Sequence, residues 1–144
     1  MHDLPRQLKV AELVELFEGH TRLVEELARR DDPLADAETV IAELDEHDKV
    51  EALNAHPPIG ARNLSKRSAA EQGTGGEPAV LTELAYLNQV YEEKFGFRFV
   101  VFVNGRPKSE ILEVLRQRLD RTREQELETG LHELVAIARD RATR

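Results

Sequence analysis

Residues 95–103 read FGFRFVVFV, and this stretch decides the fold class of the 144-residue chain. Aromatic and β-branched residues bounded by Asn104 and Gly105 are typical of a β-strand. The sequence contains no second run of this kind, so a strand here would have no partner. We therefore expect an extended segment buried between helices, with backbone N–H and C=O groups that find partners outside any sheet.

Apolar residues on both sides of this run recur at helical spacing. We expect seven main helical stretches: Leu4–Phe17, Thr21–Arg30, a helix from Asp36, Asp48–Ala55, Ala79–Lys94, a helix capped by Ser109 and reaching Asp120, and Arg123–Ala142. Pro78 suits the first turn of the fifth of these helices. The prediction is an all-α, single-domain bundle of seven or eight helices over residues 1–144, with one short buried extended segment.

Composition excludes several classes of function. The chain has 28 acidic residues against 20 Lys and Arg, a net charge of −8, which disfavours a nucleic-acid partner. The arginines at 116, 118, 121 and 123 alternate with acids and are predicted to form a solvated helix face. There is no cysteine, the five histidines show no metal-ligand spacing, and no apolar run reaches the ~20 residues of a membrane span. We expect a soluble cytoplasmic protein without a metal.

A histidine followed by two prolines marks the first candidate site, His56-Pro57-Pro58-Ile59-Gly60. Pro57 disfavours helix at His56 and so ends the preceding helix on a rigid corner. Histidine is the side chain best suited to exchange a proton near neutral pH. On these residues alone, a helix stop whose histidine merely packs or hydrogen-bonds a carbonyl is the favoured interpretation.

The second candidate is Ser68-Ala69-Ala70-Glu71-Gln72, which has the spacing of a capping box. In that interpretation the Glu71 carboxylate accepts the N–H of Ser68. In the alternative it accepts a hydrogen bond from His56 and orients the imidazole. Ser68, Gln72 and the free N–H groups of the helix start could also bind an anion.

Two further features could contribute to a site. The side chains of Phe97 and Phe99 are expected in the core, but the backbone of the extended run could hold a planar heterocyclic ligand. Arg139 and Arg141, near the end of the last helix, could each bind an anion, and the residues alone do not choose between them.

The motifs taken together resemble the OHCU decarboxylase family along essentially the whole chain. The resemblance rests on AHPPIG, SAAEQ, YEEKFGFRFVVFV, SEILEVLRQRL and IARDR, in that order. It implies conversion of 2-oxo-4-hydroxy-4-carboxy-5-ureidoimidazoline to (S)-allantoin and carbon dioxide in uric acid degradation. It also implies an all-helical fold, catalysis without metal or organic cofactor, and a homodimer. The rival functions are a noncatalytic helical binding module and a lyase acting on a related ureide.

The resemblance assigns roles to individual residues. His56 is the expected catalytic histidine, Glu71 its partner, and Arg141 the expected anchor for the substrate carboxylate. The other expected substrate contacts are Pro57, Ser68, Ala69, Ala70, Gln72, Phe99, Val100, Val101, Phe102 and Val103. The chain departs from the family pattern at Arg98, where proline is usual, and at Ala142, where leucine is usual.

Overall fold

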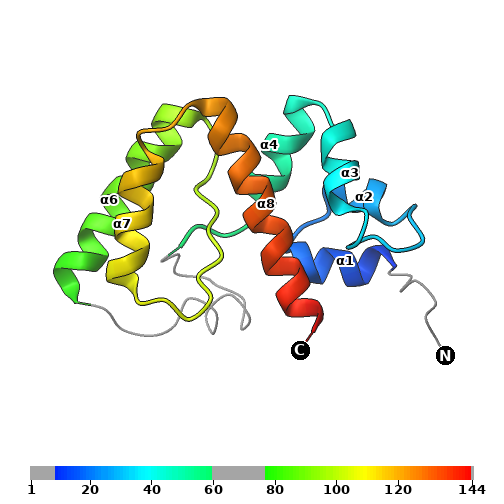
Figure 1. Cartoon of the computed structure of the whole chain (residues 1–144), viewed down its shortest axis with the longest axis horizontal. Coiled ribbons are helices and arrows are strands. Elements are labelled where there is room, and N and C mark those ends of the chain that lie inside the picture. The colour runs from blue at the N-terminus through cyan, green and yellow to red at the C-terminus, as the bar shows by residue number, and fades with distance from the viewer. Residues whose placement is uncertain (1–8, 60–76, 144) are drawn as a thin grey trace.

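The computed structural model describes residues 9–59 and 77–143, which form helices joined by loops (Figure 1). These two ranges contain seven helices and no strand: α1 (Val10–Phe17), α2 (Arg22–Leu27), α3 (Ala37–Glu43), α4 (Glu46–Ala55), α6 (Pro78–Phe95), α7 (Lys108–Arg118) and α8 (Arg123–Ala142). The prediction of an all-α fold is confirmed. None of the helices in the described ranges has the length and apolar composition that crossing a membrane requires.

Helix α8 lies between two groups of helices (Figure 1). On one side it packs against α1, α3 and α4, and α2 contacts α1, α3 and α4 in turn. On the other side α6 packs against α7. The chain returns from the end of α6 to the start of α7 as an extended segment, so these two helices run in the same direction (Figure 1).

Local sequence signals set several helix ends. The Asp45 side chain accepts a backbone N–H at the start of α4 (2.9 Å), as expected of an N-cap. Thr122 and Gln125 form a capping box at the start of α8. Helix α6 begins with Pro78 and ends at Gly96, whose φ of 82° is the left-handed conformation that glycine adopts most easily.

Helix α7 begins two residues earlier than a cap at Ser109 would place it. Ser109 lies inside the first turn, so its predicted capping role is wrong. Pro107 is the residue before the helix, and its carbonyl accepts the N–H of Ile111 (3.1 Å). Proline needs no partner for an N–H and has a suitable fixed φ, here −68°, so the chain enters the helix directly after it.

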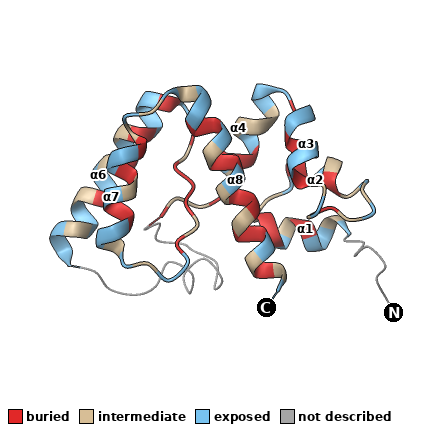
Figure 2. Cartoon of the chain, in the orientation of Figure 1, coloured by how far each residue is buried: buried red, intermediate tan, exposed pale blue. Residues whose placement is uncertain are grey.

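Residues 97–103 form the predicted extended segment. Every side chain in it is buried except those of Arg98 and Phe102, which are half-buried (Figure 2). Side chains, not a second strand, bind part of its backbone. Arg118 Nη1 donates to the Val100 carbonyl (2.8 Å), Glu133 accepts the Phe102 N–H (3.1 Å), and Arg106 donates to the Phe102 carbonyl (2.5 Å). The expectation that its backbone finds partners outside a sheet is confirmed for the Val100 carbonyl and for both backbone groups of Phe102.

A buried ionic network supports this segment from all three neighbouring helices. Glu126 is fully buried and accepts hydrogen bonds from Arg118 Nε and from the Tyr91 hydroxyl, both at 2.7 Å. Arg121 Nη1 binds the other carboxylate oxygen of Glu126 at 3.0 Å. Burial, and next the hydrogen bond to Glu126, raise the pKa of Tyr91, so the phenol remains a donor.

Arg118 corrects one sequence prediction. It was expected on a solvated face with its neighbours, but only 5% of its surface is exposed. The buried Glu126 carboxylate and the Val100 carbonyl both need a donor, and one guanidinium satisfies both. Its plane also lies over the Phe99 ring, 4.6 Å from the ring centroid. Arg116, by contrast, is exposed as predicted.

The substitution Glu126→Gln should lower the free energy of unfolding by about 3–5 kcal/mol, because it leaves Arg118 buried without its carboxylate partner. Glu128→Gln on the same helix is the matched control. Its side chain is 61% exposed and pairs only with the exposed His132 at 3.5 Å, so the loss should be at most about 1 kcal/mol. Urea unfolding of both variants measures the difference, and equal losses would contradict the importance of the buried network.

Gly19, between α1 and α2, lies against the last turn of α4. A Cβ at this position would stand 2.7 Å from the Cβ of Ala55. Gly19→Ala should therefore destabilise the fold by about 1–3 kcal/mol, since two rigid segments must separate. The double variant with Ala55→Gly should recover at least about 1 kcal/mol of this loss in a double-mutant cycle. Strictly additive unfolding energies would show that this close approach does not matter.

Candidate functional site

His56 lies at a corner where α4 ends. Its backbone is extended (φ −78°, ψ 135°), its N–H donates to the Leu53 carbonyl at 3.2 Å, and Pro57 follows it directly. The residue is 7% exposed. The predicted helix end at His56 is confirmed, and the histidine is held at a buried position whose backbone is fixed on its N-terminal side.

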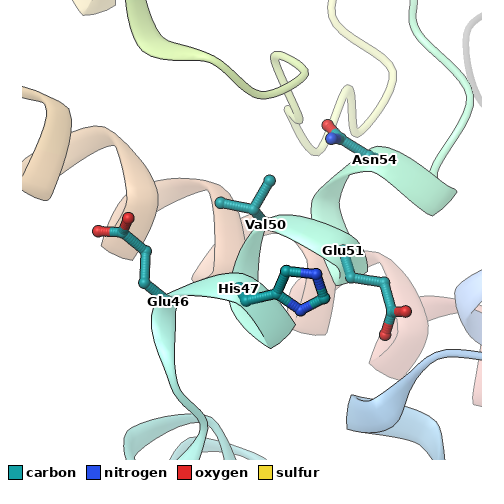
Figure 3. Close-up of a pocket in the computed structure, with 5 residues that line it drawn as sticks. All are labelled: Glu46, His47, Val50, Glu51 and Asn54. Carbon is teal, nitrogen blue, oxygen red and sulfur yellow. The ribbon is translucent and has the colours of Figure 1, made fainter.

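Arg98 joins this corner to the extended segment. Its backbone N–H donates to Asn54 Oδ1 at 3.0 Å, and its Nη1 donates to the His56 carbonyl at 3.0 Å. Asn54 lies in the last turn of α4, at the opposite end of the helix from Glu46 (Figure 3). The corner at His56 and the extended segment at Arg98, which are 42 residues apart in the sequence, are therefore in direct contact in the fold.

The residues after His56 pass beside α6. The buried Asn88 side chain on α6 donates to the Ile59 carbonyl at 3.5 Å, a long hydrogen bond. Ile59 itself is 8% exposed and belongs to the core. The chain thus contacts the extended segment at His56 and α6 at Ile59.

The extended segment presents one row of backbone groups that no described residue binds. In an extended chain the backbone groups of alternate residues point to the same side. The Val100 carbonyl and both backbone groups of Phe102 meet the arginines and Glu133 described above. Within the two described ranges, the N–H and C=O groups of Phe99 and Val101 have no hydrogen-bond partner. These four groups are available to a planar ligand with its own donors and acceptors.

Five of the predicted contact residues are consecutive in the extended segment, and their side chains differ in burial. The segment contains Phe99, Val100, Val101, Phe102 and Val103. The ring of Phe99 packs edge-on against Tyr91, 5.2 Å between centroids, so its side chain belongs to the core. Phe102 is the most exposed of the five. That the backbone of these residues contacts a substrate stays a prediction.

Arg139 and Arg141, which the residues alone could not separate, have different surroundings. Arg139 is exposed and binds Glu38 and the Leu34 carbonyl. Its hydrogen bond, the larger cause, together with its charge, lowers the pKa of the Glu38 carboxyl. Arg141 is 1% exposed, donates to the Leu16 carbonyl (2.9 Å), and pairs with Glu18 (3.2 Å). Arg141 is therefore the buried cation of the two, already facing one carboxylate.

Ser68, Ala69, Ala70, Glu71 and Gln72 lie outside the described residues. The predicted contact between the Glu71 carboxylate and the His56 imidazole therefore stays a prediction, as does the competing capping box.

Sequence reasoning missed the residues that hold the site together. Asn54 and Asn88 carry no motif, and Arg118 stands in a run of alternating charges that is typical of a solvated face. The one available signal was the expectation that residues 97–103 need backbone partners. That expectation did not say which side chains, 3 to 44 positions away, would supply them.

A hollow lies on the outer face of α4 (Figure 3). It has a volume of about 440 Å³ and is lined by Glu46, His47, Val50, Glu51 and Asn54. The Glu46 carboxylate accepts a hydrogen bond from Arg123 Nη1 at 2.9 Å. The Glu51 carboxylate accepts the backbone N–H of Arg22 at 2.8 Å. Nearby, Asp45, His47 and Asp48 have ligand atoms within 4.8 Å of one another. Because Asp45 serves as the N-cap of α4, we explain this cluster by helix capping.

Relatives with a stated activity share about a third of the aligned sequence. The 2-oxo-4-hydroxy-4-carboxy-5-ureidoimidazoline decarboxylase of Halalkalicoccus jeotgali is 34% identical over 95 residues, 62% of this chain and 54% of that protein. The corresponding decarboxylase of Haloferax volcanii is 29% identical over 137 residues, 86% and 80% of the two chains. The uric acid degradation bifunctional protein of Arabidopsis thaliana is 35% identical over 100 residues, 62% and 31%. The chain thus spans about half of the Halalkalicoccus jeotgali protein and about a third of the Arabidopsis thaliana protein.

Two solved structures share the fold. A crystal structure of OHCU decarboxylase in the presence of (S)-allantoin superposes with a TM-score of 0.75 at 26% identity, over 90% of this chain and 94% of that one. A crystal structure of (S)-allantoin synthase gives a TM-score of 0.69 at 22% identity, over 92% and 47%, which shows the fold alone. The family model described as OHCU decarboxylase matches residues 2–143. The chain therefore belongs to the OHCU decarboxylase family.

Proposed function

We propose that this chain decarboxylates 2-oxo-4-hydroxy-4-carboxy-5-ureidoimidazoline to (S)-allantoin and carbon dioxide. One observation carries the proposal: the buried His56 is joined through Arg98 to a segment whose Phe99 and Val101 backbone groups no described residue binds. A candidate proton-transfer residue is thus linked, through Arg98, to a segment that carries backbone donors and acceptors for a flat ring. Membership of the family and the likeness to a decarboxylase structure obtained in the presence of (S)-allantoin support the same reaction.

The ring and the ureido group of the substrate would lie along residues 99–103. Both carry alternating N–H and C=O groups, which match the alternating backbone groups of an extended chain. Backbone donors fixed in a buried segment are also suited to stabilise negative charge that develops in the transition state, because they need no reorganisation. Gln72, with Ser68, Ala69 and Ala70, would also contact the substrate.

The chemistry itself requires an electron sink, which the substrate supplies. The bond between the ring carbon and its carboxylate breaks, and the electron pair moves into the ring toward the conjugated C=N nitrogen. Carbon dioxide leaves, that nitrogen takes up one proton from solvent, and a neutral enol remains. A proton then adds to the carbon that carries the ureido group, and the hydroxyl loses its proton to become the carbonyl of allantoin.

His56 would donate or accept the proton on one face of the ring, and Pro57 would contact the substrate beside it. A histidine can donate or accept a proton near neutral pH. Glu71 would accept a hydrogen bond from the imidazole, which fixes the tautomer and the ring orientation. Delivery from one face explains why a single enantiomer forms. A homodimer and a cytoplasmic location, which the sequence led us to expect, stay predictions.

Arg141 would bind the substrate carboxylate. Its guanidinium is buried, so its charge is little screened by water, and it already pairs with Glu18. A guanidinium has five N–H donors and can serve two carboxylates. The substrate carboxylate would be a further anionic partner.

The substitution His56→Gln should lower kcat by about 10²–10⁴-fold, the usual contribution of a general acid–base residue. The remaining product should be racemic. Circular dichroism on freshly generated substrate measures both rate and enantiomer. His47→Gln is the matched control, since His47 lies on the same helix with an 87% exposed side chain, and it should keep the rate and the S product. A wild-type rate with wholly S product from His56→Gln would refute the proposal.

The two arginines of the last helix provide a second test. Arg141→Lys should raise KM by about tenfold or more, because lysine cannot reproduce the fork of donors that a carboxylate binds. Arg139→Lys should leave KM within about twofold, since Arg139 pairs with Glu38 at the surface. Steady-state kinetics separates the two. The reverse pattern would move the carboxylate anchor to Arg139.

A further inference from the structure

Arg98 makes two hydrogen bonds to the last residues of α4. Its backbone N–H donates to Asn54 Oδ1, and its guanidinium Nη1 donates to the carbonyl of His56, both at 3.0 Å. Its Nε lies 3.9 Å from Glu92, too long for a hydrogen bond. The two close contacts therefore both lead to the helix end that carries His56.

The second of these bonds fixes the backbone of His56 from its C-terminal side. The N–H of His56 is already bound to the Leu53 carbonyl at 3.2 Å. With its carbonyl bound to Arg98, both peptide planes that flank the histidine are held, and so are its φ and ψ. The direction of its Cα–Cβ bond, which aims the imidazole, is set by these two angles.

The charge of Arg98 suits this place. The C-terminus of a helix carries partial negative charge on carbonyls that have no partner within the helix. His56 is the C-cap of α4, and the Arg98 guanidinium reaches the carbonyl of that residue. The contact is part-buried, so solvent screens it less than a contact at the surface.

We propose that Arg98 is a positioning residue for His56 and acts through the histidine backbone without touching the substrate. This inference rests on the proposed function of His56. A proline at position 98, which the family resemblance led us to expect, could make neither hydrogen bond, because it has no N–H and no guanidinium. This chain fixes its catalytic corner with hydrogen bonds from Arg98.

Arg98→Ala tests the inference. It should lower kcat by about tenfold or more, since small displacements of a catalytic group have large effects on rate. KM should change by less than about threefold, because binding does not require an exactly aimed imidazole. The product should lose part of its S excess. Arg98→Lys should recover much of kcat, as it keeps a charged donor.

Arg123→Ala is the matched control. Arg123 has a similar exposure, 37% against 35% for Arg98, and likewise donates to a backbone carbonyl, that of Phe95, at 2.9 Å. It should lose similar stability but keep kcat within about twofold. Asn54→Ala provides an independent variant should Arg98→Ala fail to fold. Asn54 is exposed, and its loss removes only the other hydrogen bond to Arg98, so kcat should fall by about threefold.

A double-mutant cycle separates this inference from the proposed function. If Arg98 acts through His56, Arg98→Ala should have no further effect on the residual rate of His56→Gln. If His56→Gln is as active as the wild type, the proposed function itself falls. If His56→Gln is inactive while Arg98→Ala and Asn54→Ala match the Arg123→Ala control, the positioning role alone is refuted. Additive losses in the cycle would also refute it.

Discussion

The helices of this protein are arranged around one extended segment that has no partner strand. Residues 97–103 cross the middle of the molecule, and their backbone must be bound by side chains. Arg118 on α7 binds the Val100 carbonyl, and Glu126 on α8 neutralises Arg118 in a buried setting. Tyr91 on α6 donates to the same Glu126 carboxylate. Each of the three helices around the segment thus supplies one member of a single hydrogen-bonded network, and the packing of the helices and the position of the segment depend on each other.

The same arrangement explains how a bundle of helices can offer a backbone surface to a ligand. Within a helix every central N–H and C=O is used internally, and within a sheet the neighbouring strands use them. Here side chains bind the Val100 carbonyl and both backbone groups of Phe102, and the row at Phe99 and Val101 has no described partner. Such a row is rigid and carries no net charge. It suits a flat, polar ring better than side chains that must be ordered on binding.

Much of this could be predicted from the sequence, because the decisive patterns are local. The run at 95–103, the helix end before Pro57 and the core positions of Phe97 and Phe99 follow from composition and backbone chemistry within a few residues. The burial of Arg118 was predicted wrongly, since its carboxylate lies eight positions away on another helix and its carbonyl eighteen away. The links from Arg98 to Asn54 and His56 span more than forty positions and have no sequence signature. Glu71 lies outside the described residues, so the sequence remains the basis for its role.

The central claim is that the substrate lies along the extended segment beside His56. A crystal structure of the chain with (S)-allantoin tests it most directly. The account predicts that polar atoms of the ligand lie within about 3.2 Å of the backbone N–H or C=O of Phe99 or Val101, with the ring facing the His56 imidazole. Binding confined to the hollow on the outer face of α4, away from the segment, would contradict the account.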